Sequence, residues 1–306
     1  MEFPSTDTFF NKGIEEIDSL LDIIGSNFSS MIMATVTKKR TFFIRGEILL
    51  CAQNTLKSID YCCSQGFFSD AYVLARKYRD DLMLYLFLVD TVDKQNGKGD
   101  EENPVSCKDL TEEEFVQMVM KTIEELYNNE RKDIRELVVG SWLRGELRTE
   151  YDKIRKDYFA AAKYVQNLIK NSYVKEAYNR FFKAVWEEVD TILNNYTHVN
   201  SPQYVLANIC SNRSEQNELC KSLEHILHQI TVIFLSMLIL IHPQAIMSGE
   251  YEDYLDFGVI PPDGAQYRVA SGVIDYIHAH FDNIDSQLCK YLNDHNKYNM
   301  KILEDL

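Results

Sequence analysis

Hydrophobic residues recur at spacings of three and four along most of the chain, a pattern typical of amphipathic α-helices. The first such stripe covers residues 7–26 and is closed by Gly25, and a second runs from about residue 37 to residue 64. A third helix follows, with Ser69 able to cap its first turn, and should end near Val92. Only 12 glycines and 6 prolines occur in 306 residues, which favours helices over a turn-rich β fold.

The composition changes abruptly after the third helix. Residues 93–109, DKQNGKGDEENPVSCKD, are almost entirely polar, as in exposed and mobile loops. We therefore expect three parts: N-terminal helices at 1–92, a polar mobile loop at 93–109, and a long-helix bundle at 110–306. The last part either completes one core with the first or forms a second, closely packed lobe.

Helical patterns also cover most of the second half of the chain. Residues 147–170 and 173–196 read as two long helices that form an antiparallel hairpin. Residues 201–212 have no assignable pattern, and residues 248–270 mix aromatic, acidic and turn residues. The expected fold class is all-α: a multi-helix bundle with long antiparallel helices and a mixed, loop-rich C-terminal segment. Shorter helices are expected at 111–128, 131–145, 265–282 and from Ser286 onward.

The most apolar stretch is ITVIFLSMLILI, residues 230–241. Its twelve residues fall short of the roughly 18–20 that a bilayer requires, and polar residues flank both ends. We interpret it as a helix buried in the middle of the bundle, and expect no membrane span.

Five charged residues stand directly before an apolar run in RKYRDDLMLYLFLVD, residues 76–90. On a helix, Arg76 and Asp80 form an i,i+4 pair on the face that becomes core, and Lys77 and Asp81 form a second pair beside it. Arg79 lies between them. The charges either fix how helices pack or line a polar site, and we favour packing. Buried charges require partners, so side chains from elsewhere in the chain should reach this cluster.

One source of partners is LNNYTHVN, residues 193–200, at the end of a long helix. Asn194 can reach the charged cluster from there. His198 can interact with the helix dipole and the last carbonyl groups, or it can take part in a site.

This segment resembles a motif of the HEPN superfamily, helical proteins common in bacterial toxins and phage defence. Many members carry Arg-Asn-x-x-x-His near a helix end, and this chain reads Leu193-Asn194-Asn195-Tyr196-Thr197-His198. In active members the arginine and histidine act on the RNA 2′-hydroxyl and scissile phosphate, so Leu193 in place of arginine removes the cation that stabilises the transition state. RKYRDDL and DYLDFGVIPPDGAQYRVA also resemble segments of uncharacterised bacterial proteins.

The resemblance implies a HEPN-like defence protein, of antiphage, abortive-infection or toxin–antitoxin type. With a degenerate nuclease motif, it would act by binding a partner rather than as an enzyme. One alternative is an active, metal-independent RNA endonuclease that uses His198 with Arg76 or Arg79. The other is a non-catalytic helical interaction protein unrelated to this superfamily.

Candidate metal ligands are scattered. His225 and His228 lie one turn apart and could share an ion with Glu224 or His242, but no further ligand motif completes such a set. His278 and His280 should diverge on a helix, because residues two apart do not share a face. We therefore expect neither a metal nor a cofactor.

A second candidate surface is the acidic and aromatic segment around Pro261–Pro262. Tyr251, Tyr254, Tyr267 and Arg268 could bind a partner there, or the aromatic side chains could pack over the end of the bundle, which we favour.

Charge and cysteine content narrow the setting. A formal net charge of −15 disfavours loose binding to RNA, so a protein partner or homo-oligomer is the expected mode of interaction. Seven cysteines without CxxC spacing, and an N-terminus without a signal-peptide pattern, indicate a reducing, cytoplasmic location.

Overall fold

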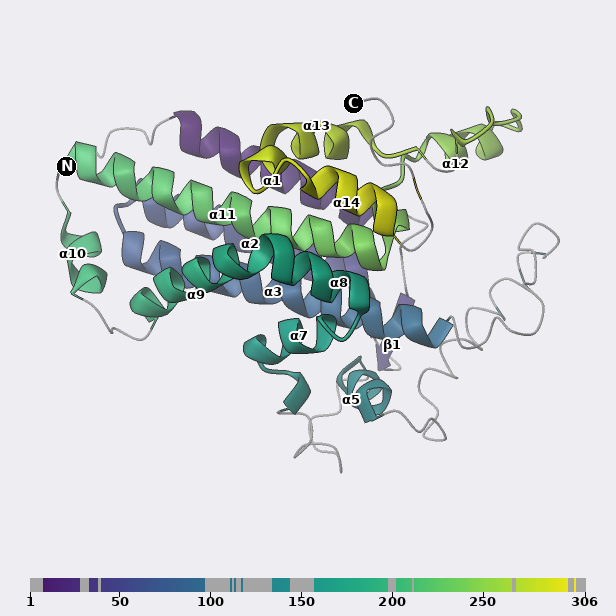
Figure 1. Ribbon diagram of the computed structural model, residues 1–306, viewed down its shortest axis with the longest axis horizontal. Coiled ribbons are helices and arrows are strands. Elements are labelled where there is room, and N and C mark those ends of the chain that lie inside the picture. Colours follow the sequence, from purple (N-terminus) through teal and green to yellow (C-terminus); the bar gives the residue numbers. More distant parts are fainter. Residues whose placement is uncertain are drawn as a thin grey trace.

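The computed structural model confirms an all-α, multi-helix bundle (Figure 1). Its three longest helices in the first half are α1 (Thr8–Ser26), α2 (Ile44–Ser64) and α3 (Phe68–Asn96). Helix α2 packs on α1 and α3, and these two also pack on α11 (Arg213–Ile241). The structure describes residues 8–27, 33–37, 40–96, 111, 113, 117, 134–143, 157–197, 202–210, 212–265, 268–296 and 300.

Helix α3 lies at the centre of the molecule. It contacts α2, α11, α7, α9, α10 and α5, and its residues 82–91 are buried with one exception, Leu84, which is half-buried. Tyr78, Tyr85 and Phe87 are among the largest fully buried side chains. The apolar run that follows the charged residues therefore builds the core, as its pattern predicts, and the helix continues past the expected end at Val92 to Asn96. The rest of the predicted loop, residues 97–109, lies outside the described residues.

The second expected helix begins later than predicted, because a β-hairpin precedes it. Strand β1 (Met33–Thr37) pairs antiparallel with β2 (Arg40–Phe43), and α2 starts only at Ile44. The hairpin sequence is rich in β-branched and aromatic residues such as Thr35, Val36 and Phe42, which favour strands. The helix predicted from about residue 37 wrongly included strand β2, because short apolar runs fit both a strand and a helix.

The segment from 172 to 197 is one continuous helix, close to the predicted 173–196. It comprises α8 (Ser172–Ala177), a π-helical turn (Tyr178–Phe182) and α9 (Lys183–Thr197). Asn171 caps it by accepting a hydrogen bond from the Tyr173 amide.

The helix expected at 147–170 is wrong in extent. Within its described part, residues 159 and 160 leave the helical conformation, and α7 (Ala161–Leu168) begins after Ala160, whose backbone is extended. One of the other predicted helices, 131–145, corresponds to α5 (Ile134–Leu143).

Helix α11 confirms the buried-helix interpretation of the apolar stretch. Every residue from 230 to 241 is buried. Of the most apolar 18-residue stretch of the helix, 78% is buried inside the protein. The helix is long and apolar enough to cross a membrane, but its burial is that of a core helix in a soluble protein.

Residues 201–212, which had no predicted structure, include the short helix α10 (Gln203–Ile209). Ser69 ties this helix to α3: its hydroxyl donates a hydrogen bond to the Tyr204 carbonyl, and its amide donates to the Asn208 side chain at 2.8 Å. Ser69 therefore lies inside the first turn of α3 and joins two helices, instead of capping one as predicted.

The C-terminal part alternates short helices with turns and loops, as its mixed sequence predicts. A 3₁₀ turn (Pro243–Ile246) leads to α12 (Glu250–Asp256). This helix and the residues that follow it stand out from the bundle in Figure 1, and we call residues 250–265 the C-terminal arm. An antiparallel bridge between Met247 and Val269 closes the base of that arm. The helix α13 (Ser271–His280) then lies across α1, a 3₁₀ turn (Phe281–Asn283) follows, and α14 (Leu288–His295) is the last described helix.

Candidate functional site

The charged residues of α3 meet α9, and partners from α9 reach them as expected. The Arg76 guanidinium donates to the Asn194 side-chain oxygen at 2.7 Å and lies 4.0 Å from the Asp80 carboxylate. Arg79 contacts the carboxylates of Asp80 at 2.9 Å and Asp190 at 2.7 Å. The Asn194 amide also donates to Asp190 at 2.9 Å. Two arginines and two aspartates thus form one connected network across the two helices.

Arg79 is the anchor of this network. Its side chain is only 4% exposed, and its guanidinium lies 5.2 Å from the centre of the Trp186 ring, within the range of a cation–π interaction. Burial raises the pKa of Asp80, and the neighbouring charges of Arg79 and Arg76 oppose that rise. The network therefore compensates part of the cost of removing its charges from water.

Lys77 and Asp81 form the second predicted ion pair, and Lys77 also donates to the Thr55 hydroxyl of α2 at 3.1 Å. The Lys77 side chain is 52% exposed, so this pair lies at the surface, where ion pairs contribute little. The five charged residues at positions 76–81 of α3 consequently divide into a half-buried network toward α9 and a surface pair toward α2.

Residues 193–197 of the segment that resembles the HEPN motif lie in α9, and the first of them faces the core. Leu193, at the position of the motif arginine, is fully buried. Tyr196 stacks on Tyr72 of α3 with ring centres 4.1 Å apart. Of the motif residues, only Asn194 joins the polar network, and His198 lies outside the described residues.

The C-terminal arm exposes apolar side chains other than the four residues proposed from the sequence as partner-binding. Of the four predicted residues, Tyr251 and Tyr254 are half-buried, Arg268 is exposed and pairs with Glu250 at 3.3 Å, and Tyr267 lies outside the described residues. The large exposed side chains are instead those of Leu255 (52%), Phe257 (82%), Val259 (52%) and Ile260 (91%).

The end of α12 explains this exposure. The Gly258 amide donates to the Leu255 carbonyl, and the Val259 amide donates to the Tyr254 carbonyl. Gly258 has φ 66°, so the helix ends in a Schellman turn that glycine makes accessible. After this turn the apolar residues FGVI (257–260) run along the surface. The sequence could have indicated this, because these residues lack the three-and-four spacing of a helix with one buried face.

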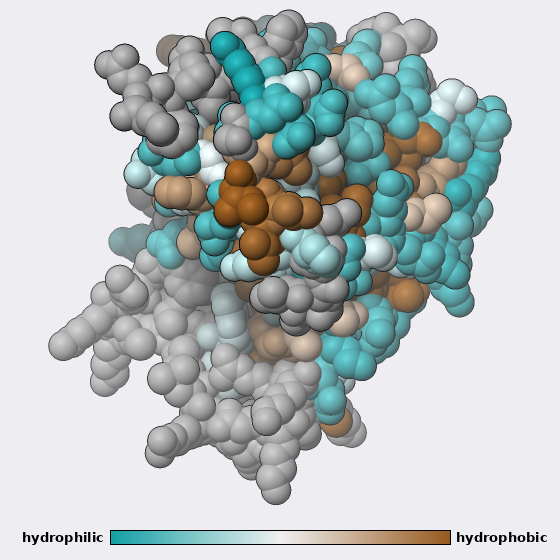
Figure 2. Space-filling model, turned by 90° about the vertical axis from the view of Figure 1, so that its left-hand side faces the viewer, coloured by the Kyte–Doolittle hydropathy of each residue, from teal (hydrophilic) through white to brown (hydrophobic). Residues whose placement is uncertain are grey.

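The opposite end of the bundle carries a second apolar surface. Figure 2, which faces the end where α10 lies, shows hydrophobic residues gathered there. Val205, Leu206 and Ile209 of α10 are 54%, 58% and 67% exposed, and Phe67, immediately before α3, is 47% exposed.

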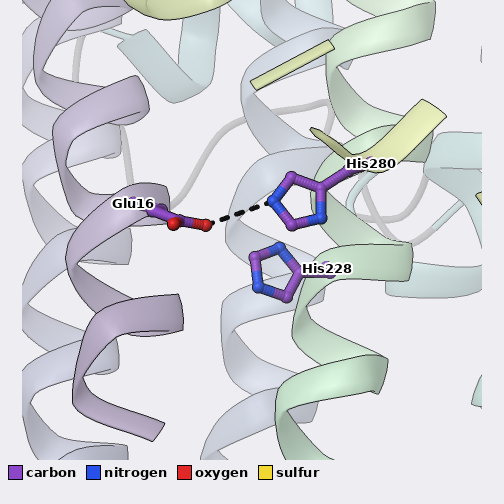
Figure 3. A group of neighbouring side chains, drawn as sticks. All are labelled: Glu16, His228 and His280. Carbon is purple, nitrogen blue, oxygen red and sulfur yellow. Dashed lines mark hydrogen bonds and ion pairs between the residues drawn. The ribbon is translucent and has the colours of Figure 1, made fainter. Parts of the chain in front are cut away.

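A third cluster joins residues that are far apart in the sequence. Glu16 of α1, His228 of α11 and His280 of α13 point toward one another (Figure 3). The Glu16 carboxylate lies 3.2 Å from Nε2 of His280, and the rings of His228 and His280 stack with centres 4.0 Å apart. The Tyr276 hydroxyl lies 2.9 Å from Nδ1 of His228.

This cluster borders a cavity of about 240 Å³, lined by His228 and His280 together with Lys221, Glu224 and His225. Burial lowers the pKa of His228 to about 3, with further contributions from His280 and His225. Burial also raises the pKa of Glu224, and the nearby Glu16 carboxylate adds to that rise.

The cluster differs from the combinations of histidines considered from sequence. His242, at the C-terminal end of α11, is 14 residues from His228, which places it about 21 Å away along the helix. His278 is exposed whereas His280 turns toward α1, so the predicted divergence of these two histidines is confirmed. Glu16 could not be associated with them from sequence, because only the packing of α1 beside α11 and α13 brings it there.

Comparison of the chain with models of known families, with curated proteins and with solved structures found no match.

Proposed function

We propose that this chain is a HEPN-like helical protein of bacterial defence or toxin type that acts by binding a protein partner rather than by cleaving RNA. The observation that carries the proposal is the group of exposed apolar side chains on the C-terminal arm. Exposed clusters of large apolar side chains mark interaction sites in soluble proteins, and Ile260 and Phe257 are 91% and 82% exposed.

The chemistry of the arm suggests what it binds. Its apolar side chains stand beside the exposed acidic residues Glu250, Asp253, Asp256 and Asp263. A complementary partner would present an apolar groove with basic residues along its rim, because opposite rim charges steer association and favour the correct register. The Schellman turn and the Met247–Val269 bridge hold the arm in shape before binding, which lowers the entropy lost on association.

The charged network weighs against the nuclease alternative. RNA cleavage of the HEPN type would need a cation free to meet a phosphate, yet Arg76 and Arg79 already contact the side chains of Asn194, Asp80 and Asp190. Leu193 is buried, so the position of the motif arginine is directed into the core.

We place the protein in the cytoplasm, where cysteines stay reduced. The six cysteines in the described part of the chain are all free thiols. Cys63 and Cys220 are both buried, and a hydrogen bond between them together with burial raises the pKa of Cys63. No cofactor is part of the proposal.

The test compares two double variants, each of which replaces two exposed apolar residues by serine. Phe257→Ser/Ile260→Ser alters the arm, and Val205→Ser/Ile209→Ser alters the α10 surface as a matched control. Partners are recovered from source cells with each protein, and the purified partner is then titrated against all three. Sedimentation of each protein alone reports self-association.

We expect the arm variant to bind its partner at least about 30-fold more weakly, the loss typical of a hot-spot residue, and the α10 variant to bind like the unaltered protein. If a second copy is the partner, the arm variant should lose self-association in the same way. Unchanged affinity in the arm variant, or loss only in the α10 variant, would refute the assignment of the arm.

A further inference from the structure

Three helices that are distant in the sequence bring one carboxylate and two imidazoles to one point. The ligand atoms of Glu16, His228 and His280 all lie within 4.8 Å of one another (Figure 3). Two histidines and one carboxylate are a common protein ligand set of zinc sites that keep one coordination position open. We propose that these three residues bind one divalent transition-metal ion, Zn²⁺ being the ion that best fits this ligand set.

One of the three ligand separations already fits a bound ion, and one ring has to turn. Ligand atoms bound to one tetrahedral Zn²⁺ at about 2.1 Å lie about 3.4 Å apart, and the Glu16 carboxylate is already 3.2 Å from Nε2 of His280. The rings of His228 and His280 are nearly parallel, with an interplanar angle of 17°. An imidazole binds a metal in the plane of its ring, so one ring must turn out of this stack when the ion enters.

Tyr276 orients His228 for this role. Its hydroxyl engages Nδ1 of His228 at 2.9 Å, which leaves Nε2 of the same ring as the donor to a metal. Histidine ligands commonly have their second ring nitrogen held by such an outer partner.

The charged groups around the site balance one another, and there is space beside it for a further ligand. Glu16 is joined near the site by Glu224, while the positive groups that approach are Lys12, 3.6 Å from Glu16, and Lys221 in the cavity wall. The adjoining cavity of about 240 Å³ has room for a water molecule as the fourth ligand. An ion here would join α1, α11 and α13.

The experiment titrates the reduced, metal-free full chain with Zn²⁺ by calorimetry, and with Co²⁺ by absorption spectroscopy. We expect one equivalent to bind, with a cobalt spectrum that lacks the thiolate charge-transfer band, since the ligands are nitrogen and oxygen. His228→Ala and His280→Ala should weaken binding by more than about 100-fold, because loss of an outer partner alone costs about 10-fold to 100-fold.

The matched control is His278→Ala, which removes an exposed histidine two residues from His280 on the same helix. It should bind like the unaltered protein, and Tyr276→Phe should bind about 10-fold more weakly. Glu16→Gln keeps the size of the side chain and tests the carboxylate even if a histidine variant fails to fold. Absence of stoichiometric binding, a thiolate band, or unchanged binding in Glu16→Gln would each overturn the proposal.

Discussion

Replacement of Arg79 by methionine tests whether the charged network of α3 stabilises the fold. Methionine keeps an apolar stem of similar length against Trp186 but leaves Asp80 and Asp190 without their shared cation. If the network fixes the packing of α3 on α9, the variant should be clearly less stable. If Arg79 instead serves an active site, its removal should be neutral or stabilising, because functional polar groups are often kept at a cost in stability.

The magnitude follows from the exposure of the three side chains. Breaking a fully buried ion pair costs about 3–5 kcal/mol, and breaking an exposed one costs up to about 1 kcal/mol. Arg79 is 4% exposed, but Asp80 and Asp190 are 29% and 44% exposed and can recover some hydration. We therefore expect a loss of about 2–3 kcal/mol. With about 2.1 cal/mol/K of unfolding entropy per residue over 306 residues, the melting temperature should fall by about 3–5 °C.

The assay is thermal and urea unfolding followed by circular dichroism. The matched control is Lys77→Met, which removes a cation from the same helix at a side chain that is 52% exposed, and should cost less than about 1 kcal/mol. A destabilisation of Arg79→Met no larger than that of Lys77→Met would refute the structural role of the network.

The pH dependence of the same variant provides a further check. Burial raises the pKa of Asp80 above its unfolded value, so the contribution of this group to stability is fully present below the unfolded pKa and is lost as the pH rises through the folded pKa. Arg79→Met removes the charge that opposes this rise, and the folded pKa of Asp80 should increase further. The stability gap between variant and unaltered protein should therefore be widest near neutral pH and narrow toward about pH 5. A gap that is constant or grows on acidification would contradict this reasoning.

Two other substitutions test the packing of the bundle. Asp90→Asn removes the charge that pairs with Arg135 at 2.9 Å, where both side chains are at most 10% exposed; urea unfolding should show a loss of about 3–5 kcal/mol, and a loss below about 1 kcal/mol would contradict the buried pair. Gly272→Ala would place a methyl group 2.6 Å from the Ile23 side chain and should lower stability by about 1–3 kcal/mol. Gly249→Ala meets nothing within 4 Å and is its control, so equal effects of the two alanines would contradict the close approach of α13 to α1.

Short sequence patterns predict the fold well where they are compatible with only one kind of structure. The run at residues 230–241 could be assigned to a buried helix because its twelve residues and polar flanks favour a core helix over a membrane span, and Arg76 and Asp80 could be paired from their helical spacing. The hairpin at residues 33–43 was missed, and its second strand was taken for the start of the next helix, because short apolar runs fit either structure.

The candidate sites were harder to predict, since their members come together only through packing. Spacing identifies Arg76 and Asp80, but not Asp190, which reaches Arg79 from α9. Spacing likewise separates His278 from His280, but nothing near either residue in the sequence points to Glu16. The segment was recognised by its aromatic residues, which include the exposed Phe257, but its pattern did not single out Ile260, which is 91% exposed.

An RNA cleavage assay with the purified protein tests the central proposal, partner binding without nuclease activity, most directly. The unaltered chain and His198→Ala are incubated with labelled RNA in chelator, since the alternative enzyme would be metal-independent, and His278→Ala serves as the matched histidine control. Because Arg76 and Arg79 are engaged by other side chains and Leu193 is buried, we predict no cleavage above background by any of the three. Cleavage by the unaltered protein and by His278→Ala that His198→Ala abolishes would contradict the proposal and establish the nuclease alternative.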